Sequence, residues 1–504
     1  MTVGPGKTLG TNLRMSCAVP QRLHPRRWFF LAAVAGLALH LGAALPLYRL
    51  QDRFAAWLLL VVLLGSIRHY AAHDWGRIPV LVLVTAQIYV FYGLPQFTQD
   101  SLKLFIGLYS PTGPALTTAV WLVLAGELAF LGGYCGALHI TSRRRNFFDR
   151  WVPVPQAHWA PEAIGYAGVS LIIYSLMWLR PTYVPLAFRH VVLQTFNAYL
   201  SIAILFLMRY RFGLRMCGWT AWGLVFVMTL VGIVAGVMGA MVYPFVAALM
   251  CLWLAGRAST WRWLVVIALG VLVLNPVKNE FRRLSWYEKD ISSVASVRER
   301  FGDWADAFGI AWGKGWRYSG EANVRETADR ASDLLFFCQA VDVVPAWVPY
   351  RYGEGLGTLA AFWVPRFIWP SKPSATELVN DVYAKVFGVS SEAGVMSSTV
   401  AVPPFLEGYW NFGIPGVVLF LAVYGVMLGL LLGNSGKWGS ASVLVGIAFL
   451  GPSPFPLQEI TIALSHAISV AGASCAAMWG LAMFAGAPSA LRRTVSGGRL
   501  RQRQ

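Results

Sequence analysis

The sequence predicts an all-α fold, a polytopic transmembrane helix bundle of about 12 spans with one large, partly helical loop on the outer side. Three observations predict it. Of the 504 residues, 57% are hydrophobic and only 13% are charged, whereas globular proteins carry about 25% charged residues. Apolar runs near the roughly 20 residues that a helix needs to cross a bilayer recur along the chain. One long stretch, 277–411, interrupts them.

The apolar runs divide the chain into membrane and non-membrane segments. We expect spans at residues 28–48, 53–67, 78–97, 114–140, 163–179, 187–208, 218–235, 238–256, 263–276, 412–433, 441–461 and 463–484. The resulting organisation is a basic N-terminus (1–27), nine spans (28–276), the large loop (277–411), three spans (412–484) and a basic tail (485–504). No small-residue cleavage site follows the first run, so we expect a retained anchor.

The distribution of positive charge sets the orientation. The segments expected in the cytoplasm hold 22 Lys and Arg residues, and the short outer loops and their edges hold five. This alternation is typical of the positive-inside rule and places both termini in the cytoplasm. The net charge of +18 is therefore read as a topology signal with attraction to anionic lipid, and no nucleic-acid partner is expected. The six cysteines are scattered singly with no metal-site spacing, so no metal or other cofactor is expected.

The loop 277–411 differs in composition from the rest of the chain. It holds 16 of the 23 acidic residues and 14 basic ones, and structureless loops of this length usually carry function. We expect helices at 293–310 and 322–341. The short apolar piece 355–369 is broken by Pro365 and is expected to lie in the interface or to re-enter the membrane.

The side chains of this loop suggest an anionic, sugar-bearing lipid as ligand. Arg recurs, and its planar fork grips phosphate oxygens with two hydrogen bonds. Aromatic rings are interspersed with the Arg residues, and flat rings match the apolar faces of sugars. Carboxylates, among them Asp333, Glu354 and Glu407, could act as a general base toward a sugar hydroxyl. The same residues also fit a plainer interpretation, in which Arg pairs with acids on a solvated loop and Trp anchors the membrane boundary.

Ionisable residues inside spans are rare and therefore informative. Glu127 lies in the middle of an expected span and His466 lies in the last one, as His40 and Glu459 lie in others. One interpretation is a neutral group hydrogen-bonded between helices. The other is the polar lining of a channel for a lipid headgroup.

Three short motifs stand at the end of the loop. Residues 350–359 read YRYGEGLGTL, residues 365–373 read PRFIWPSKP, and residues 404–413 read PFLEGYWNFG before the next span. Their order over residues 330–435 resembles the bacterial oligosaccharide repeat-unit polymerases, the Wzy-type O-antigen and exopolysaccharide polymerases. Many members of that family carry an Arg beside small residues in a span before the loop, whereas residues 236–240 here read GVMGA.

The resemblance implies a metal-independent glycosyltransferase of the bacterial inner membrane. Two undecaprenyl-diphosphate-linked glycans, donor and acceptor, would meet at its periplasmic face, and a chain-length regulator or export-complex proteins are further partners to expect. The leaving diphosphate needs positive charge, for which the candidates are Arg351, Arg366 and Lys372, with Arg282 and Arg330 in reserve. Glu407 is the first candidate for the base and Asp333 the second. The sugar-binding candidates are Tyr352, Trp369, Tyr409 and Trp410.

Other functions remain open from the sequence. An O-antigen ligase would use the same donor with a different acceptor. A flippase or transporter of the lipid-linked oligosaccharide belongs to a different class, and such proteins often contain internal repeats with sites at the membrane midplane, which this sequence does not show. A non-catalytic subunit of an export complex is a further alternative.

Overall fold

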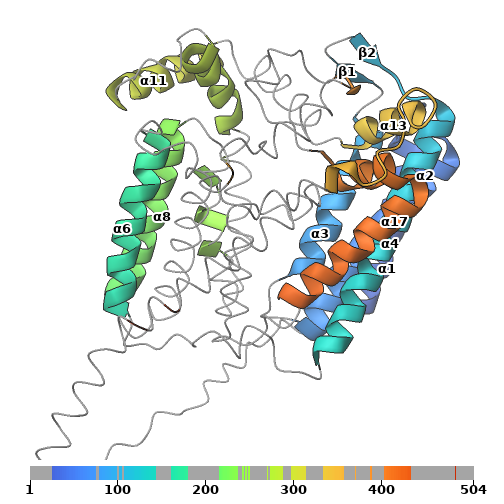
Figure 1. The fold of residues 1–504 in the computed structure, drawn as a ribbon, viewed down its shortest axis with the longest axis horizontal. Coiled ribbons are helices and arrows are strands. Elements are labelled where there is room, and N and C mark those ends of the chain that lie inside the picture. Colours follow the sequence, from blue (N-terminus) through green and yellow to red (C-terminus); the bar gives the residue numbers. More distant parts are fainter. Residues whose placement is uncertain are drawn as a thin grey trace, which may run out of the picture.

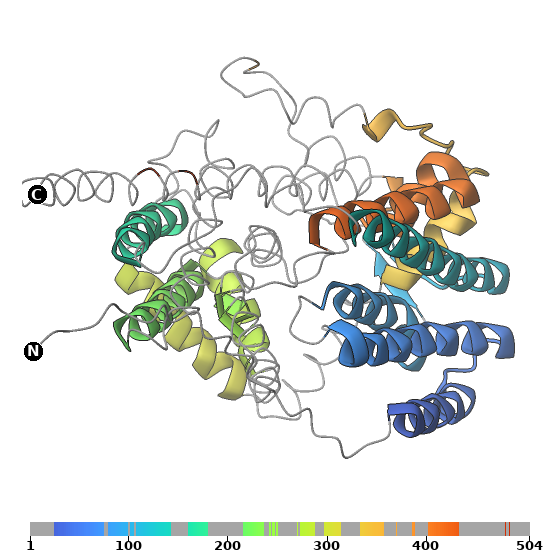
Figure 2. The same cartoon turned by 90° about the horizontal axis from the view of Figure 1, so that it is seen from below.

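The computed structural model confirms a mostly helical chain (Figure 1). It describes residues 25–74, 79–98, 101–104, 107–142, 160–179, 215–235, 273–287, 297–313, 333–356 and 402–432, with the short pieces 241–242, 244–246, 248–249, 270, 369, 386–388, 479 and 483. In both cartoon views the described helices gather into two groups (Figures 1 and 2).

The larger group contains the N-terminal helices together with helices from the end of the chain. Its helices are α1 (Pro25–Ala43), α2 (Leu50–His69), α3 (Val80–Ile88), α4 (Gly113–Ser142), α13 (Asp333–Val343) and α17 (Pro404–Leu432). A π-helix, η1 (Tyr70–Asp74), extends α2, and the π-helix η2 (Tyr89–Gly93) and the 3-10 helix η3 (Leu94–Phe97) extend α3. The short strands β1 (Leu102–Leu104) and β2 (Gly107–Tyr109) pair antiparallel, with Lys103 opposite Leu108.

Four described helices are long and apolar enough to cross a membrane. They cover Leu50–Ala72, Val80–Phe97, Gly113–Ile140 and Pro404–Leu430, and each overlaps an expected span. Shorter apolar helices occur at Trp28–Ala43, Ala167–Leu176 and Trp219–Val234, within three further expected spans. The remaining expected spans (187–208, 238–256, 263–276, 441–461 and 463–484) lie wholly or mostly outside the described residues, so the number of about 12 stays a prediction.

Helices α4 and α17 lie side by side in both cartoon views (Figures 1 and 2), because small residues let their backbones approach. A Cβ atom on Gly133 would meet the carbonyl oxygen of Ala422 on α17, and one on Gly425 would meet the carbonyl oxygen of Phe130 on α4. A Cβ atom on Gly126 would instead meet side chains of α17, the ring of Phe405 first. Close approach through small residues is a common way to associate helices in membranes, where the hydrophobic effect supplies no attraction between them.

The expected span 412–433 corresponds to the second part of helix α17 (Pro404–Leu432), and the sequence did not predict the helical residues before it. Helix α17 begins at Pro404, and the backbone of Phe412 and Gly413 leaves the helical region. In one continuous helix Gly408 and Gly416 would lie about 12 Å apart, yet a Cβ atom on Gly408 would lie 2.9 Å from the Gly416 carbonyl oxygen. The chain therefore folds back at 412–413 and packs the short helix 404–411 against the start of the longer helix 414–432. The apolar sequence before residue 412 allows this burial.

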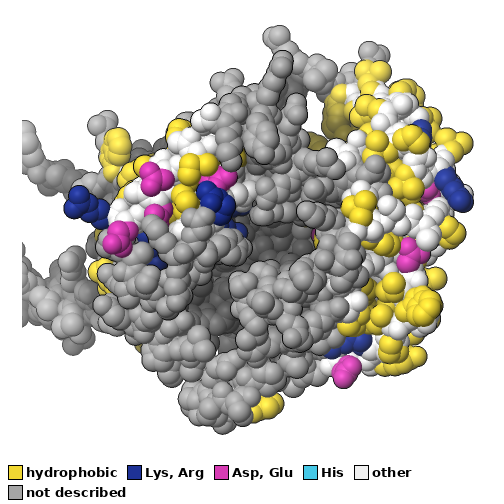
Figure 3. All heavy atoms as spheres, turned by 90° about the horizontal axis from the view of Figure 1, so that it is seen from above, with side chains coloured by type: hydrophobic (Ala, Val, Ile, Leu, Met, Phe, Trp, Pro, Cys, Tyr) yellow, Lys and Arg dark blue, Asp and Glu magenta, His cyan; other side chains and the backbone are white. Residues whose placement is uncertain are grey.

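The smaller group contains α6 (Ala160–Leu179), α8 (Arg215–Ala235), the helix 273–282 with the π-helix η6 (Arg283–Tyr287), and α11 (Val297–Gly313). Trp304 of α11 stacks on Phe281 with ring centroids 4.8 Å apart and donates a hydrogen bond to the carbonyl of Ile233 in α8. Charged side chains of both signs lie among hydrophobic ones on the surface of α11, where Phe301 and Phe308 are also exposed (Figure 3). Helices α11 and α13 confirm the two helices expected in the loop, although residues 322–332 of the second lie outside the described residues.

Candidate functional site

Two of the three motifs meet at the end of the short helix 404–411. The backbone N–H of Arg351 donates to the carbonyl of Trp410 at 3.0 Å, and the N–H of Tyr352 donates to the carbonyl of Asn411 at 3.1 Å. The last carbonyls of a helix lack partners within the helix and must find them elsewhere. The segment 350–353 therefore caps the short helix, and this cap fixes the two motifs relative to each other.

The backbone of this cap is bent by two consecutive residues with positive φ. Tyr352 has φ of 49° and Gly353 has φ of 85°. This conformation turns the N–H of Gly353 toward the side-chain Oδ1 of Asn411, at 3.0 Å. Successive N–H groups in such a bend often bind an anion. Here the protein itself uses them, so an anion at this site would need a different donor.

Arg351 provides that donor. Its guanidinium lies over the Trp410 ring, 4.8 Å from the centroid, in a cation–π contact. The side chain is only 14% exposed, and its nearest carboxylate is that of Glu354 at 4.0 Å, which is 79% exposed. A solvated pair at that distance contributes little. Among the described residues no group accepts a hydrogen bond from this guanidinium, so its planar set of donors is free to take a phosphate.

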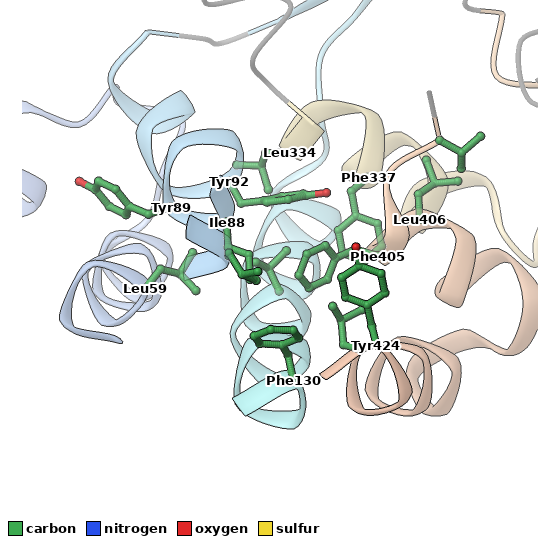
Figure 4. Close-up of a cluster of buried hydrophobic side chains, with 14 of the residues drawn as sticks. Leu59, Ile88, Tyr89, Tyr92, Phe130, Leu334, Phe337, Phe405, Leu406 and Tyr424 are labelled. Atoms are coloured by element: carbon green, nitrogen blue, oxygen red, sulfur yellow. The ribbon is translucent and has the colours of Figure 1, made fainter. Parts of the chain in front are cut away.

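Aromatic side chains pack beneath the cap. Tyr409 contacts Phe337 of α13 edge-on, with centroids 5.9 Å apart, and Tyr350 at 6.5 Å. Phe337 also contacts Phe405 at 6.2 Å, and both belong to the buried cluster that joins α13 to α17 and α4 (Figure 4). Tyr409 and Trp410 are thus buried, and of the four sugar-binding candidates Tyr352, at 74% exposed, offers the most accessible ring.

The two candidate bases lie on different helices of this assembly. Glu407 belongs to the short helix and is 5% exposed, and its carbonyl accepts a hydrogen bond from Asn411 Nδ2 at 2.8 Å. Asp333 is the first residue of α13, one turn before Phe337, and residues four apart share a helix face. The residue as a whole is partly exposed, but the surrounding protein desolvates the carboxyl group and raises the pKa of Asp333 from 3.8 to about 7.

The other predicted site residues fall into three sets. Arg282 lies in the smaller group beside Phe281, whose hydrophobic cluster is separate from the one that contains Trp410, the ring beneath Arg351. Trp369 is described as a single exposed residue. Glu127 is fully buried within α4, and neither carboxylate oxygen has a hydrogen-bond partner among the described residues. The remaining candidates lie outside the described residues: Arg330, Arg366, Lys372 and His466.

The sequence also did not predict a set of hydrogen bonds at the end of α13. Asp342, near the end of α13, accepts hydrogen bonds from Tyr109 Oη at 2.5 Å and Thr112 Oγ1 at 2.6 Å. It therefore ties α13 to β2 and to the start of α4. Asn411 was likewise missed, since the motif 404–413 contains it but nothing in the sequence marks its contact with Gly353. In the part of the chain that the structure describes, no three His, Cys, Asp or Glu side chains gather as a metal site would need.

The comparisons with known proteins give one match. A family described as "Domain of unknown function (DUF8712)" matches residues 237–449. The matched region contains the cap, the short helix, α13 and all of α17. No curated protein and no solved structure matches the chain.

Proposed function

We propose that the chain joins undecaprenyl-diphosphate-linked oligosaccharide repeat units into O-antigen or exopolysaccharide at the periplasmic face of the bacterial inner membrane. The observation that carries this proposal is the largely buried Arg351 guanidinium, held over Trp410 without a hydrogen-bonding acceptor among the described residues. An anionic ligand would supply such an acceptor. The exposed ring of Tyr352 beside it suits a sugar attached to that anion.

The proposed reaction exchanges one C–O bond for another. The oxygen of an acceptor hydroxyl attacks the anomeric carbon of the donor glycan, and the bond from that carbon to the diphosphate breaks. The bonding electrons leave with the undecaprenyl diphosphate, whose growing negative charge Arg351 would stabilise. The hydroxyl proton passes to a carboxylate.

Asp333 is the favoured base in this proposal. A general base works best when its pKa is near the working pH, and the pKa of Asp333 is raised to about 7. Glu407, the first candidate from the sequence, is buried in the short helix and stays the second choice. Arg366 and Lys372 remain candidates for further contacts with the diphosphate.

The test uses the full chain reconstituted in liposomes with a synthetic undecaprenyl-diphosphate repeat unit, with product length followed on a gel. A ladder of products is expected from the wild-type protein, and Arg351→Ala and Asp333→Asn should slow its formation by about 10²-fold or more. Arg298→Ala changes an exposed Arg of α11 and serves as the matched control that should keep the ladder. Transfer of a single unit to another acceptor would instead indicate a ligase. Movement of the lipid between leaflets without any product would indicate a flippase.

A further inference from the structure

Asn411 connects the cap to the short helix through three separate hydrogen bonds. Its Oδ1 accepts from the Gly353 N–H, its Nδ2 donates to the Glu407 carbonyl, and its own carbonyl accepts from the Tyr352 N–H. The side chain is 2% exposed. The amide therefore uses both its acceptor oxygen, which holds the cap, and its donor nitrogen, which holds the short helix.

The two residues that Asn411 holds in place directly follow Arg351, the candidate hydrogen-bond donor to the phosphate. Tyr352 and Gly353 both have positive φ, and for the tyrosine this conformation is costly unless neighbouring contacts enforce it. The hydrogen bonds to Asn411 supply that enforcement at residues 352 and 353, while the Trp410 carbonyl fixes residue 351. The direction in which the Arg351 side chain leaves the backbone thus depends on Asn411.

We infer that Asn411 is a positioning residue for Arg351, holding the guanidinium where it meets the diphosphate of the lipid-linked substrate. This inference rests on the proposed function. Asn411 touches no reacting atom and acts only through the cap. A side chain without the amide leaves the Gly353 N–H without its acceptor and releases the bend that aims Arg351 over Trp410.

The distinguishing measurement is a double-mutant cycle between Asn411→Ala and Arg351→Ala. A misplacement of about 1 Å can cost about 10²-fold in kcat, and a loss of that order is expected for Asn411→Ala alone. In the Arg351→Ala background the same change should cost less than about twofold, because a residue that acts through another has no effect once the other is removed. If the losses in kcat from the two single changes multiply in the double variant, the inference is overturned and Asn411 is a structural residue only.

Two further variants separate positioning from folding. Asn411→Asp keeps an oxygen acceptor for the Gly353 N–H and loses the donor to Glu407, so it should retain more activity than Asn411→Ala. Asp342→Asn weakens the hydrogen bonds that tie α13 to β2 and α4, which do not touch the cap. The factor by which it lowers kcat should therefore multiply with the factor for Arg351→Ala. Equal activity of Asn411→Asp and Asn411→Ala would contradict a role for the Gly353 hydrogen bond.

Binding of undecaprenyl diphosphate to the full chain in nanodiscs distinguishes failure of the inference from failure of the proposed function. If no variant, wild type included, makes a product ladder, the polymerase proposal fails. The inference still stands if the wild type binds this lipid and Arg351→Ala and Asn411→Ala weaken binding by similar, non-multiplying factors. A wild-type chain that does not bind the lipid, or an Asn411→Ala variant that binds as tightly as wild type, would overturn it.

Discussion

The guanidinium of Arg351 lies 4.8 Å from the centroid of the Trp410 ring, and this contact joins two motifs from opposite ends of a 60-residue stretch of the loop. The ring restrains the cation without consuming its hydrogen-bond donors, since a cation–π contact is made with the face of the ring. A carboxylate in the same place would have neutralised the charge and occupied the donors. The arrangement thus restrains the position of Arg351 while its N–H groups stay available.

The first prediction concerns Trp410. A cation–π contact is worth about 0.5–2 kcal/mol, so Trp410→Leu should weaken binding of undecaprenyl diphosphate by about 2–30-fold. Trp410→Phe keeps a weaker ring and should lie between this variant and wild type. Binding is measured in nanodiscs. Trp347→Leu is the control, because Trp347 is 84% exposed and lies outside the cap. Equal binding by Trp410→Leu and wild type would remove the role assigned to the stacking.

The helices of the bundle were predictable from the sequence, because a span needs only a long apolar run. The expected span 114–140 corresponds to α4 at Gly113–Ser142 with differences of two residues or fewer. The hairpin at 412–413 was not predictable in this way. Residues 404–432 form one apolar run, and hydropathy does not reveal a reversal inside it. Gly413 has φ of 65° and ψ of −146°, a combination open almost only to glycine, and this glycine just before Pro415 is the one local signal.

The site was predictable only as a set of residue types. The motifs suggested Arg351, Glu407 and Trp410, but composition cannot show that 350–353 caps the helix 404–411. From the sequence, Glu407 ranked before Asp333, but composition could not show how buried each carboxylate is. Asp333 and Glu407 differ by the surroundings that tertiary packing gives them, and the pKa of Asp333 depends on burial that its sequence neighbours do not determine.

The second prediction concerns the pH dependence of activity. If Asp333 is the base, it must be ionised, and its pKa is raised to about 7. The rate of product formation should therefore rise as pH increases through about 7 and level off above it. Asp333→Asn should lose about 10²–10⁴-fold in rate and show no such rise. A wild-type profile that is flat between pH 6 and 8 would transfer the role to Glu407 or another group.

The third prediction is the effect of the same residue on stability. The pKa of Asp333 is 3.8 in the absence of burial and about 7 in the folded chain, so the folded state holds a proton that the unfolded state releases. The bound proton on Asp333 therefore adds to the free energy of unfolding, fully below pH 3.8, and this addition is lost as pH rises through about 7. Asp333→Asn does not titrate. The free energy of unfolding of Asp333→Asn, taken relative to that of wild type, should therefore increase between pH 4 and pH 7. Chemical unfolding in detergent measures both values, and a difference that stays constant with pH would contradict the prediction.

The fourth prediction compares two neighbouring glycines of α4. A Cβ atom on Gly133 would collide with the Ala422 carbonyl of α17, whereas one on Gly132 would meet nothing within 4 Å. Overpacking typically costs about 1–3 kcal/mol, so Gly133→Ala should lower the free energy of unfolding by that amount. Gly132→Ala should leave it unchanged or raise it slightly, because alanine favours the helix. Equal effects of the two changes would show that α4 and α17 do not pack this closely.

The fifth prediction contrasts two fully buried acids. Asp52 accepts hydrogen bonds from Thr117 Oγ1 at 2.7 Å and from the Arg49 N–H at 2.9 Å, so Asp52→Asn should lower the free energy of unfolding by about 1–3 kcal/mol. Glu127 has no hydrogen-bond partner among the described residues, and an ionised carboxylate buried in a span is costly. Glu127→Gln keeps the length of the side chain and removes a group that can ionise, so the melting temperature in detergent should stay the same or rise. A loss as large as that of Asp52→Asn would mean that Glu127 holds a partner contributed by residues outside the described part of the chain.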